Sequence, residues 1–68
     1  MKVKVIMIPS NKRREVEIRK GSTIFHLLQS LELKPDTVIV TRENIPVPVD
    51  DIISVDTELK IIQVASGG

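Results

Sequence analysis

The most informative absence from this 68-residue sequence is cysteine, which does not occur at all. Without it, the chain can form no disulfide, no thiolate metal site and no cysteine nucleophile. Small secreted domains usually need such cross-links, so their absence favours a cytoplasmic protein. The longest apolar run, residues 5–8, is too short for a secretory signal or a membrane span. A soluble protein with no membrane partner is therefore expected.

Aromatic residues and an excess of charge are also lacking. Phe25 is the only aromatic residue, so Val, Ile and Leu must build the core, and the branched residues favour strands. Ten basic and nine acidic residues nearly cancel, which gives no reason to expect a nucleic-acid partner. The one basic run, Lys12-Arg13-Arg14, has no interleaved aromatics and is interpreted as a solvated hairpin tip.

The apolar pattern predicts two strands, one helix and three further strands. Residues 2–8 and 15–19 alternate between polar and apolar, which indicates a β-hairpin. Thr23 is the expected helix N-cap, and the apolar residues that follow it fall on one helical stripe. Lys34-Pro35 is expected to end this helix. The predicted core consists of Val3, Val5, Val16, Ile18, Ile24, Leu27, Leu28, Leu31, Val38, Val40, Leu59 and Ile61.

The second half of the chain predicts strands at residues 37–41, 45–49 and 59–64. The prolines at 46 and 48 place the middle one on a sheet edge, and Asn44 suits the positive φ of a tight turn. The fold class is therefore α+β, a mixed four- to five-stranded sheet with one main helix on one face. Residues 1–64 are expected to form a single domain and residues 65–68 a flexible tail.

The side chains offer little catalytic chemistry. His26 is the only histidine and is interpreted as a solvated surface residue. Asp50 and Asp51 are adjacent, so in an extended segment they point to opposite sides, and acidic residues are common in turns. The sequence therefore predicts no metal site and no enzyme. The remaining chemical group is the C-terminal carboxylate, which follows Gly67 and Gly68, two of the only three glycines.

The order of these features resembles the ubiquitin-like β-grasp superfamily. Three stretches carry the resemblance, "KGSTIFHLL", "TRENIPVP" and "ELKIIQVASGG", and together they span most of the chain. Within the superfamily the sequence looks like the sulfur carriers ThiS and MoaD and the small archaeal modifier proteins. Glu43-Asn44 departs from the more usual Asn-Gly or Asp-Gly turn, which leaves the subfamily open.

The resemblance implies a sulfur carrier that binds no cofactor itself. An E1-like adenylyltransferase of the ThiF or MoeB type would use ATP to adenylate Gly68. Gly67, which has no side chain, would let the tail enter the narrow active site. A sulfur donor such as a cysteine desulfurase or rhodanese would then form a thiocarboxylate. The sulfur would go to a downstream synthase, for thiamine thiazole, molybdopterin or tRNA thiolation.

Two other functions stay open at this stage. The protein could be a ubiquitin-like modifier joined through Gly68 to lysines, or a TGS-like binding module with an incidental Gly-Gly. The free protein is expected to be a monomer. Strand parity points several apolar residues away from the helix, and we expect this face to dock on the activating enzyme. The expected docking residues are Ile62, Val64, Ile6 and Ile39.

Overall fold

A computed structural model of the chain describes residues 1–64 and confirms the α+β prediction, with one five-stranded mixed sheet and one α-helix. The expected tail, residues 65–68, lies outside the described residues. The elements in chain order are β1 Lys2–Ile8, β2 Lys12–Glu17, α1 Ile24–Ser30, the 3-10 helix η1 Pro35–Thr37, β3 Val38–Arg42, β4 Ile45–Pro46 and β5 Thr57–Gln63.

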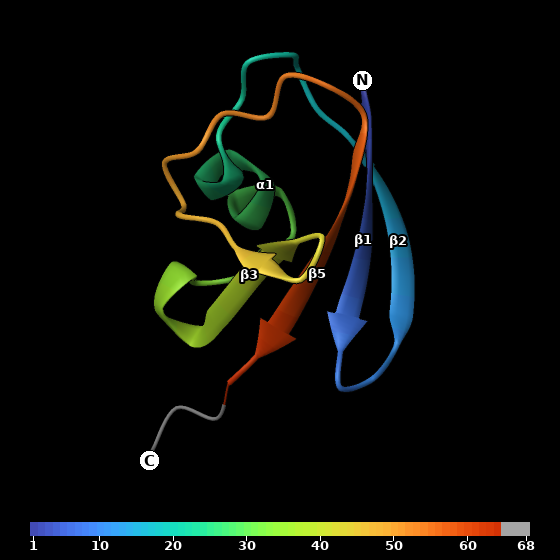
Figure 1. The fold of residues 1–68 in the computed structure, drawn as a ribbon, viewed down its shortest axis with the longest axis vertical. Coiled ribbons are helices and arrows are strands. Elements are labelled where there is room, and N and C mark those ends of the chain that lie inside the picture. Colours follow the sequence, from blue (N-terminus) through green and yellow to red (C-terminus); the bar gives the residue numbers. More distant parts are fainter. Residues whose placement is uncertain (65–68) are drawn as a thin grey trace.

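The sheet has the order β2-β1-β5-β3-β4. The first two strands form the predicted hairpin, β5 then runs parallel to β1, and β3 pairs antiparallel with both β5 and β4. The helix lies on one side of these strands (Figure 1). As a result, the last strand of the chain lies in the middle of the sheet, between β1 and β3.

The boundaries of two strands correct the sequence analysis. The run Lys12-Arg13-Arg14 is not at a hairpin tip, because β2 begins at Lys12 and the run forms its first half. The edge strand β4 is only Ile45–Pro46, since the prolines limit its ladder hydrogen bonds. The connection between β3 and β4 has the predicted tight turn, with Glu43 at φ 53° and Asn44 at φ 65°.

The helix begins at the predicted N-cap. The Thr23 hydroxyl accepts a hydrogen bond from the His26 N–H, and the Thr23 N–H donates to His26 Nδ1 at 3.2 Å. These two bonds form a capping box, in which two unpaired donors at the helix start are satisfied reciprocally. The N–H groups of Ile24 and Phe25 donate to the carbonyls of Asp51 and Val49. The loop before β5 is therefore tied to the helix start.

The helix ends four residues before the predicted Lys34-Pro35 boundary, which was wrong. Its last residue is Ser30, and Glu32 follows in the left-handed region at φ 59°. The Glu32 N–H donates to the Gln29 carbonyl, and the Leu33 N–H donates to the Leu28 carbonyl at 2.9 Å. This pair of bonds is the Schellman motif. Pro35 instead opens η1, where its fixed φ suits a helix start.

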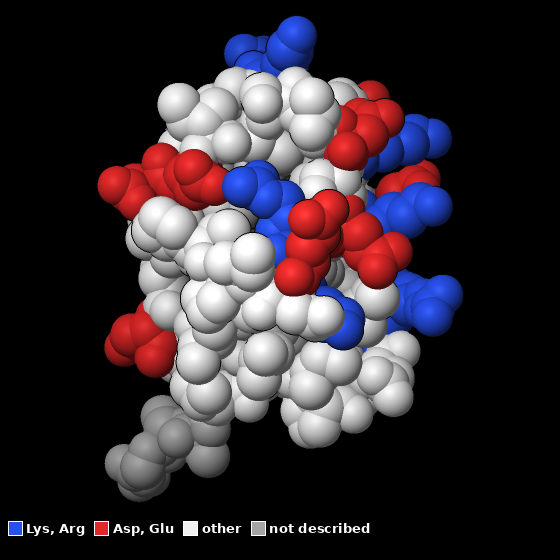
Figure 2. Space-filling model, viewed as in Figure 1, with Lys and Arg blue, Asp and Glu red and all other residues white. Residues whose placement is uncertain are grey.

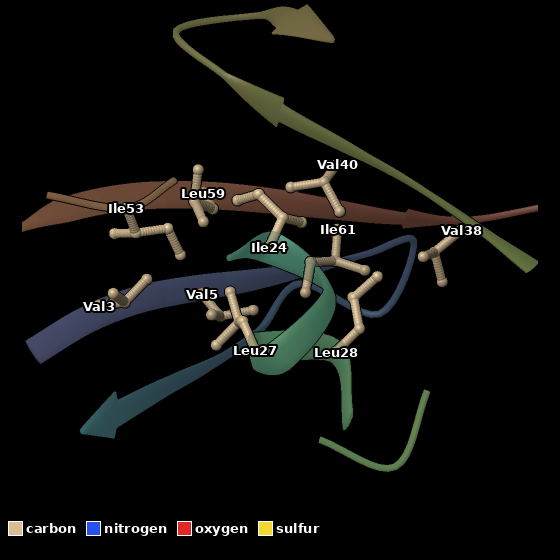
Figure 3. Packing of buried hydrophobic residues seen from close by; sticks show 10 residues of the cluster. All are labelled: Val3, Val5, Ile24, Leu27, Leu28, Val38, Val40, Ile53, Leu59 and Ile61. Carbon is tan, nitrogen blue, oxygen red and sulfur yellow. The ribbon is translucent and has the colours of Figure 1, made fainter. Parts of the chain in front are cut away.

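The core lies between the helix and the sheet (Figure 3). Most of the predicted core is buried, but Val16, Ile18 and Leu31 are only half-buried at its margin. Ile53, which the periodicity did not identify, is 1% exposed. The buried hydrophobic residues are Val3, Val5, Ile24, Leu27, Leu28, Val38, Val40, Ile53, Leu59 and Ile61.

Candidate functional site

The central strand β5 is the last element before the two glycines in the sequence. Its last ladder pair joins Gln63 to Val38, and the Val64 N–H then donates to the Thr37 carbonyl at 3.0 Å. The chain is thus held by backbone hydrogen bonds as far as Val64. Gly67 and Gly68, the expected reactive end, lie outside the described residues.

Three of the four predicted docking residues lie together at one end of the sheet, and the fourth, Ile6, borders them. Ile39 on β3 and Ile62 on β5 are direct Cα partners, and Val64 follows two residues later. Ile39 is 44% exposed and Val64 is 39% exposed. Ile6 lies at the margin of this group, opposite Arg13 on β2 and Lys60 on β5.

Sequence reasoning missed one member of this surface. Ile8, the last residue of β1, is the Cα partner of Ile62 on the other side of β5. Its parity, the same as that of Ile6, could have identified it. A row of isoleucines therefore crosses three neighbouring strands. We call Ile8, Ile39, Ile62 and Val64 the exit patch, since β5 runs through it at the C-terminal end of the described residues.

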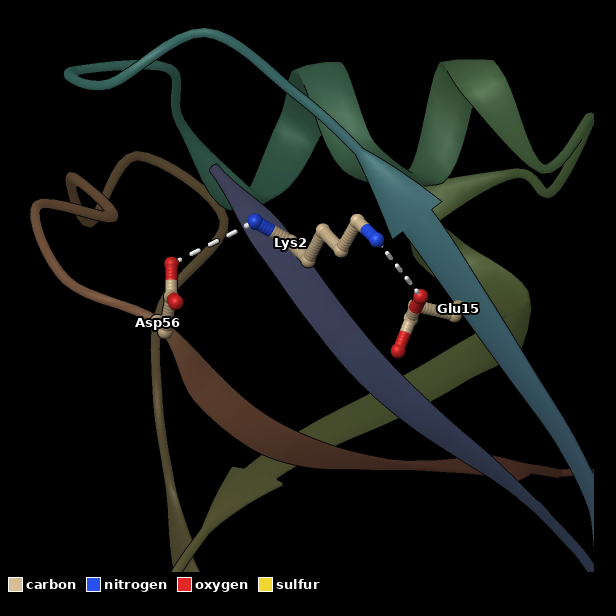
Figure 4. A network of polar contacts seen from close by, with 3 residues as sticks. All are labelled: Lys2, Glu15 and Asp56. Carbon is tan, nitrogen blue, oxygen red and sulfur yellow. Dashed lines mark hydrogen bonds and ion pairs between the residues drawn. The ribbon is translucent and has the colours of Figure 1, made fainter.

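Apart from Ile6 and Thr41, the rest of this sheet face on β1, β2, β3 and β5 is charged. Lys60 lies next to the exit patch and donates through Nζ to Asn44 Oδ1 at 3.3 Å. At the far end, the Lys2 ammonium pairs with Glu15 at 3.5 Å, and the Lys2 N–H donates to Asp56 at 3.3 Å (Figure 4). In Figure 2, charged side chains gather over the middle of the view and along the side where β2 runs, and few lie at its lower end.

Two of the three polar residues considered as catalytic candidates, His26 and Asp51, have structural partners. His26 is exposed and belongs to the capping box of the helix. Asp51 accepts a hydrogen bond from the Arg42 guanidinium at 3.3 Å, and its backbone carbonyl accepts the Ile24 N–H. Within residues 1–64, no three His, Asp or Glu side chains gather in a metal-binding cluster. Over the same residues, no helix is long and apolar enough to cross a membrane.

Comparison with known proteins decides the family. The sequence model described as "small archaeal modifier protein 2" matches residues 1–65 of the chain. The chain belongs to this family. A protein of Archaeoglobus fulgidus is 41% identical over 69 residues, and the similarity covers 100% of both chains.

A solved structure supports the fold. The chain superposes on a ubiquitin of Caldiarchaeum subterraneum with a TM-score of 0.75, covering 100% of this chain and 98% of the other. The two sequences are 18% identical, so this likeness concerns the fold alone. The structural likeness confirms the ubiquitin-like β-grasp fold, and the family match confirms the resemblance to the small archaeal modifier proteins. Ubiquitin-like modifiers generally work with E1-like activating enzymes and are not enzymes themselves.

Proposed function

We propose that this protein is a ubiquitin-like modifier whose Gly68 carboxylate is adenylated by an E1-like enzyme and then joined to lysine ε-amines. The family match supports this choice between the functions that the sequence left open. The structural observation that carries it is the path of β5, which crosses the exit patch and is held as far as Val64, four positions before Gly68. We place this reaction in the cytoplasm, where the activating enzyme has access to ATP.

The chemistry needs only the carboxylate of this chain. A Gly68 oxygen attacks the α-phosphorus of ATP in the partner's active site, and pyrophosphate leaves. A lysine ε-amine then attacks the Gly68 carbonyl carbon, AMP leaves and the amine loses a proton. Glycine at 67 and 68 allows close approach, since it has no Cβ.

A second product, a thiocarboxylate, can arise from the same adenylate. A persulfide on a donor such as a cysteine desulfurase or rhodanese would displace AMP, and a second thiol of the donor would resolve the acyl disulfide. The absence of cysteine from the sequence favours this form, because this chain cannot carry sulfur as a persulfide of its own. The sulfur would then pass to a downstream synthase.

The exit patch is proposed as the docking surface for the activating enzyme. Ordering four tail residues costs about 4–8 kcal/mol of backbone entropy, at roughly 1–2 kcal/mol per residue. Millimolar affinity corresponds to a net binding free energy of only about −4 kcal/mol. Four small residues offer little area to offset this cost, so a second contact is needed. The exit patch supplies exposed apolar area beside the strand that leads to the tail.

ATP–pyrophosphate exchange with the cognate E1-like enzyme tests the activation step. Deleting Gly68 withdraws the carboxylate by about 3.3–3.6 Å, whereas reacting atoms must lie about 3–3.5 Å apart. One alanine added after Gly68 displaces the carboxylate by a similar distance and introduces a Cβ. We expect neither variant to support exchange. If the extended variant remains active, the Gly-Gly pair is incidental and the protein is a binding module of the TGS type.

A matched pair of variants tests whether the exit patch docks on the activating enzyme. Ile39→Asp places a charge on the exit patch, and Val55→Asp places one at a site that is 66% exposed in the loop before β5. Ile39→Asp should raise the KM for this protein about tenfold with little change in kcat, whereas Val55→Asp should leave both near their starting values. Equal kinetics for the two variants would remove the exit patch from the mechanism.

A further inference from the structure

Strand β2 leaves one edge of the sheet open. Among the described residues, its only neighbour is β1, because β2 ends the strand order. All its residues are exposed except Val16, which is half-buried. An edge strand presents backbone N–H and C=O groups that can pair with another chain. The other edge, β4, is only two residues long and contains Pro46, so it is a much poorer template.

The register identifies which groups of β2 are available. Met1 and Ile18 exchange two backbone hydrogen bonds, each of 2.9 Å, so they form a hydrogen-bonded antiparallel pair. Such pairs alternate with non-hydrogen-bonded pairs along the ladder. The alternation turns the backbone groups of Val16, Arg14 and Lys12 toward β1. The groups that face the open edge are those of Arg13, Glu15 and Glu17.

The charge along this edge selects the chemistry of a partner. Lys12, Arg13 and Arg14 are consecutive and exposed, and basic side chains project along the side of the molecule where β2 runs (Figure 2). Glu15 and Glu17 follow on the same strand, so the positive charge is confined to the N-terminal half of the edge. This charge attracts an acidic strand. At the other end, half-buried Val16 offers an apolar contact on the helix side of the sheet.

We propose that the β2 edge binds an extended acidic segment of a partner protein, which adds a strand to the sheet beside β2. Acidic side chains of the segment lie against Lys12, Arg13 and Arg14, and an apolar side chain lies against Val16. The backbone of the segment pairs with Arg13, Glu15 and Glu17. This mode of recognition takes affinity from main-chain hydrogen bonds and specificity from side chains. It uses a different surface from the exit patch and requires no chemistry at Gly68.

Nuclear magnetic resonance titration tests the pairing directly. An antiparallel segment should carry its acidic residues at its C-terminal end, because the basic end of β2 is N-terminal. The probe is a capped peptide of alternating threonine and valine followed by three glutamates. Added to the uniformly ¹⁵N-labelled protein, it should shift the amide signals of Arg13, Glu15 and Glu17 most strongly. Those of Arg14 and Val16, whose N–H groups already bond β1, should shift less.

Two variants separate backbone pairing from charge. Glu15→Pro removes an N–H that faces the open edge, so it should spare the β1–β2 ladder and weaken peptide binding about tenfold or more. Arg14→Glu should weaken binding by a similar factor. The matched control is Lys34→Glu, which makes the same charge change just before η1 and β3, and β3 is separated from β2 by two strands. It should have little effect, and a peptide with lysines in place of glutamates should not bind.

Several results would overturn the proposal. They are no shift at millimolar peptide, shifts centred on Ile39 and Ile62, and equal affinity of Arg14→Glu and Lys34→Glu. A concentration-dependent mass of the free protein, with loss of the Arg13 and Glu15 signals, would instead assign the edge to a second copy of the chain. Should Glu15→Pro fail to fold, the alternating shift pattern of the unaltered protein still decides the matter.

Discussion

Replacing Leu28 by alanine is the sharpest test of the packing that supports the site. Leu28 is fully buried, and its side chain points toward Ile61 on the central strand β5 (Figure 3). A buried Leu→Ala change costs about 2–5 kcal/mol, because it loses transfer free energy and leaves a cavity. A chain of this length has a total stability of about 3–10 kcal/mol at about 0.05–0.15 kcal/mol per residue. The substitution should therefore remove a large share of the free energy of unfolding.

Urea and thermal unfolding followed by circular dichroism measure this loss. The melting temperature of Leu28→Ala should fall by about 10 °C or more, since 1 kcal/mol corresponds to roughly 4–8 °C in a domain of this size. The neighbouring residue Gln29 is exposed on the same helix, so Gln29→Ala is the matched control and should melt within a few degrees of the parent. A fall of less than about 1 kcal/mol for Leu28→Ala would refute the helix orientation and the core built on it.

Two further predictions concern backbone conformations that a non-glycine residue holds at positive φ. Glu32→Gly should stabilise the protein by up to about 1 kcal/mol in urea unfolding, because Glu32 is at φ 59° in the Schellman motif. A loss of stability would contradict the assignment of this motif. The double change of Glu43→Asn and Asn44→Gly should raise the melting temperature by a few degrees, since both residues of this hairpin turn have positive φ. An unchanged or lower melting temperature would count against the turn geometry.

The fold could be predicted wherever the apolar pattern was periodic. Alternation identified β1, and the stripe from Ile24 to Leu28 identified the helix and its buried face. The helix end was missed because Glu32 has no particular preference for the left-handed region, so the Schellman motif had no composition signal. Ile53 was missed because it is a single buried residue in a loop, held by hydrogen bonds to Ser22 and Gly21.

The sequence predicted which face of the sheet carries the exit patch, but it did not predict all of the residues that form it. Parity correctly turned Ile39 and Ile62 away from the helix, but it could not give the register between strands. Only the pairing of β1 with β5 brings Ile8 beside Ile62 and leaves Ile6 next to Lys60. The basic run was misread for a related reason, since turn residues at 9–12 hid the early start of β2.

The most direct test of the proposed function is mass spectrometry of lysine-linked peptides from the native host. Lys60 is the last Lys or Arg before Gly68, so trypsin should leave residues 61–68 attached to each acceptor lysine. We expect branched peptides with Gly68 in an isopeptide bond, and we expect them to vanish when Gly68 is deleted from the chain. Branched peptides that persist without Gly68, or a complete absence of them from cells that contain the protein and its activating enzyme, would contradict the modifier function.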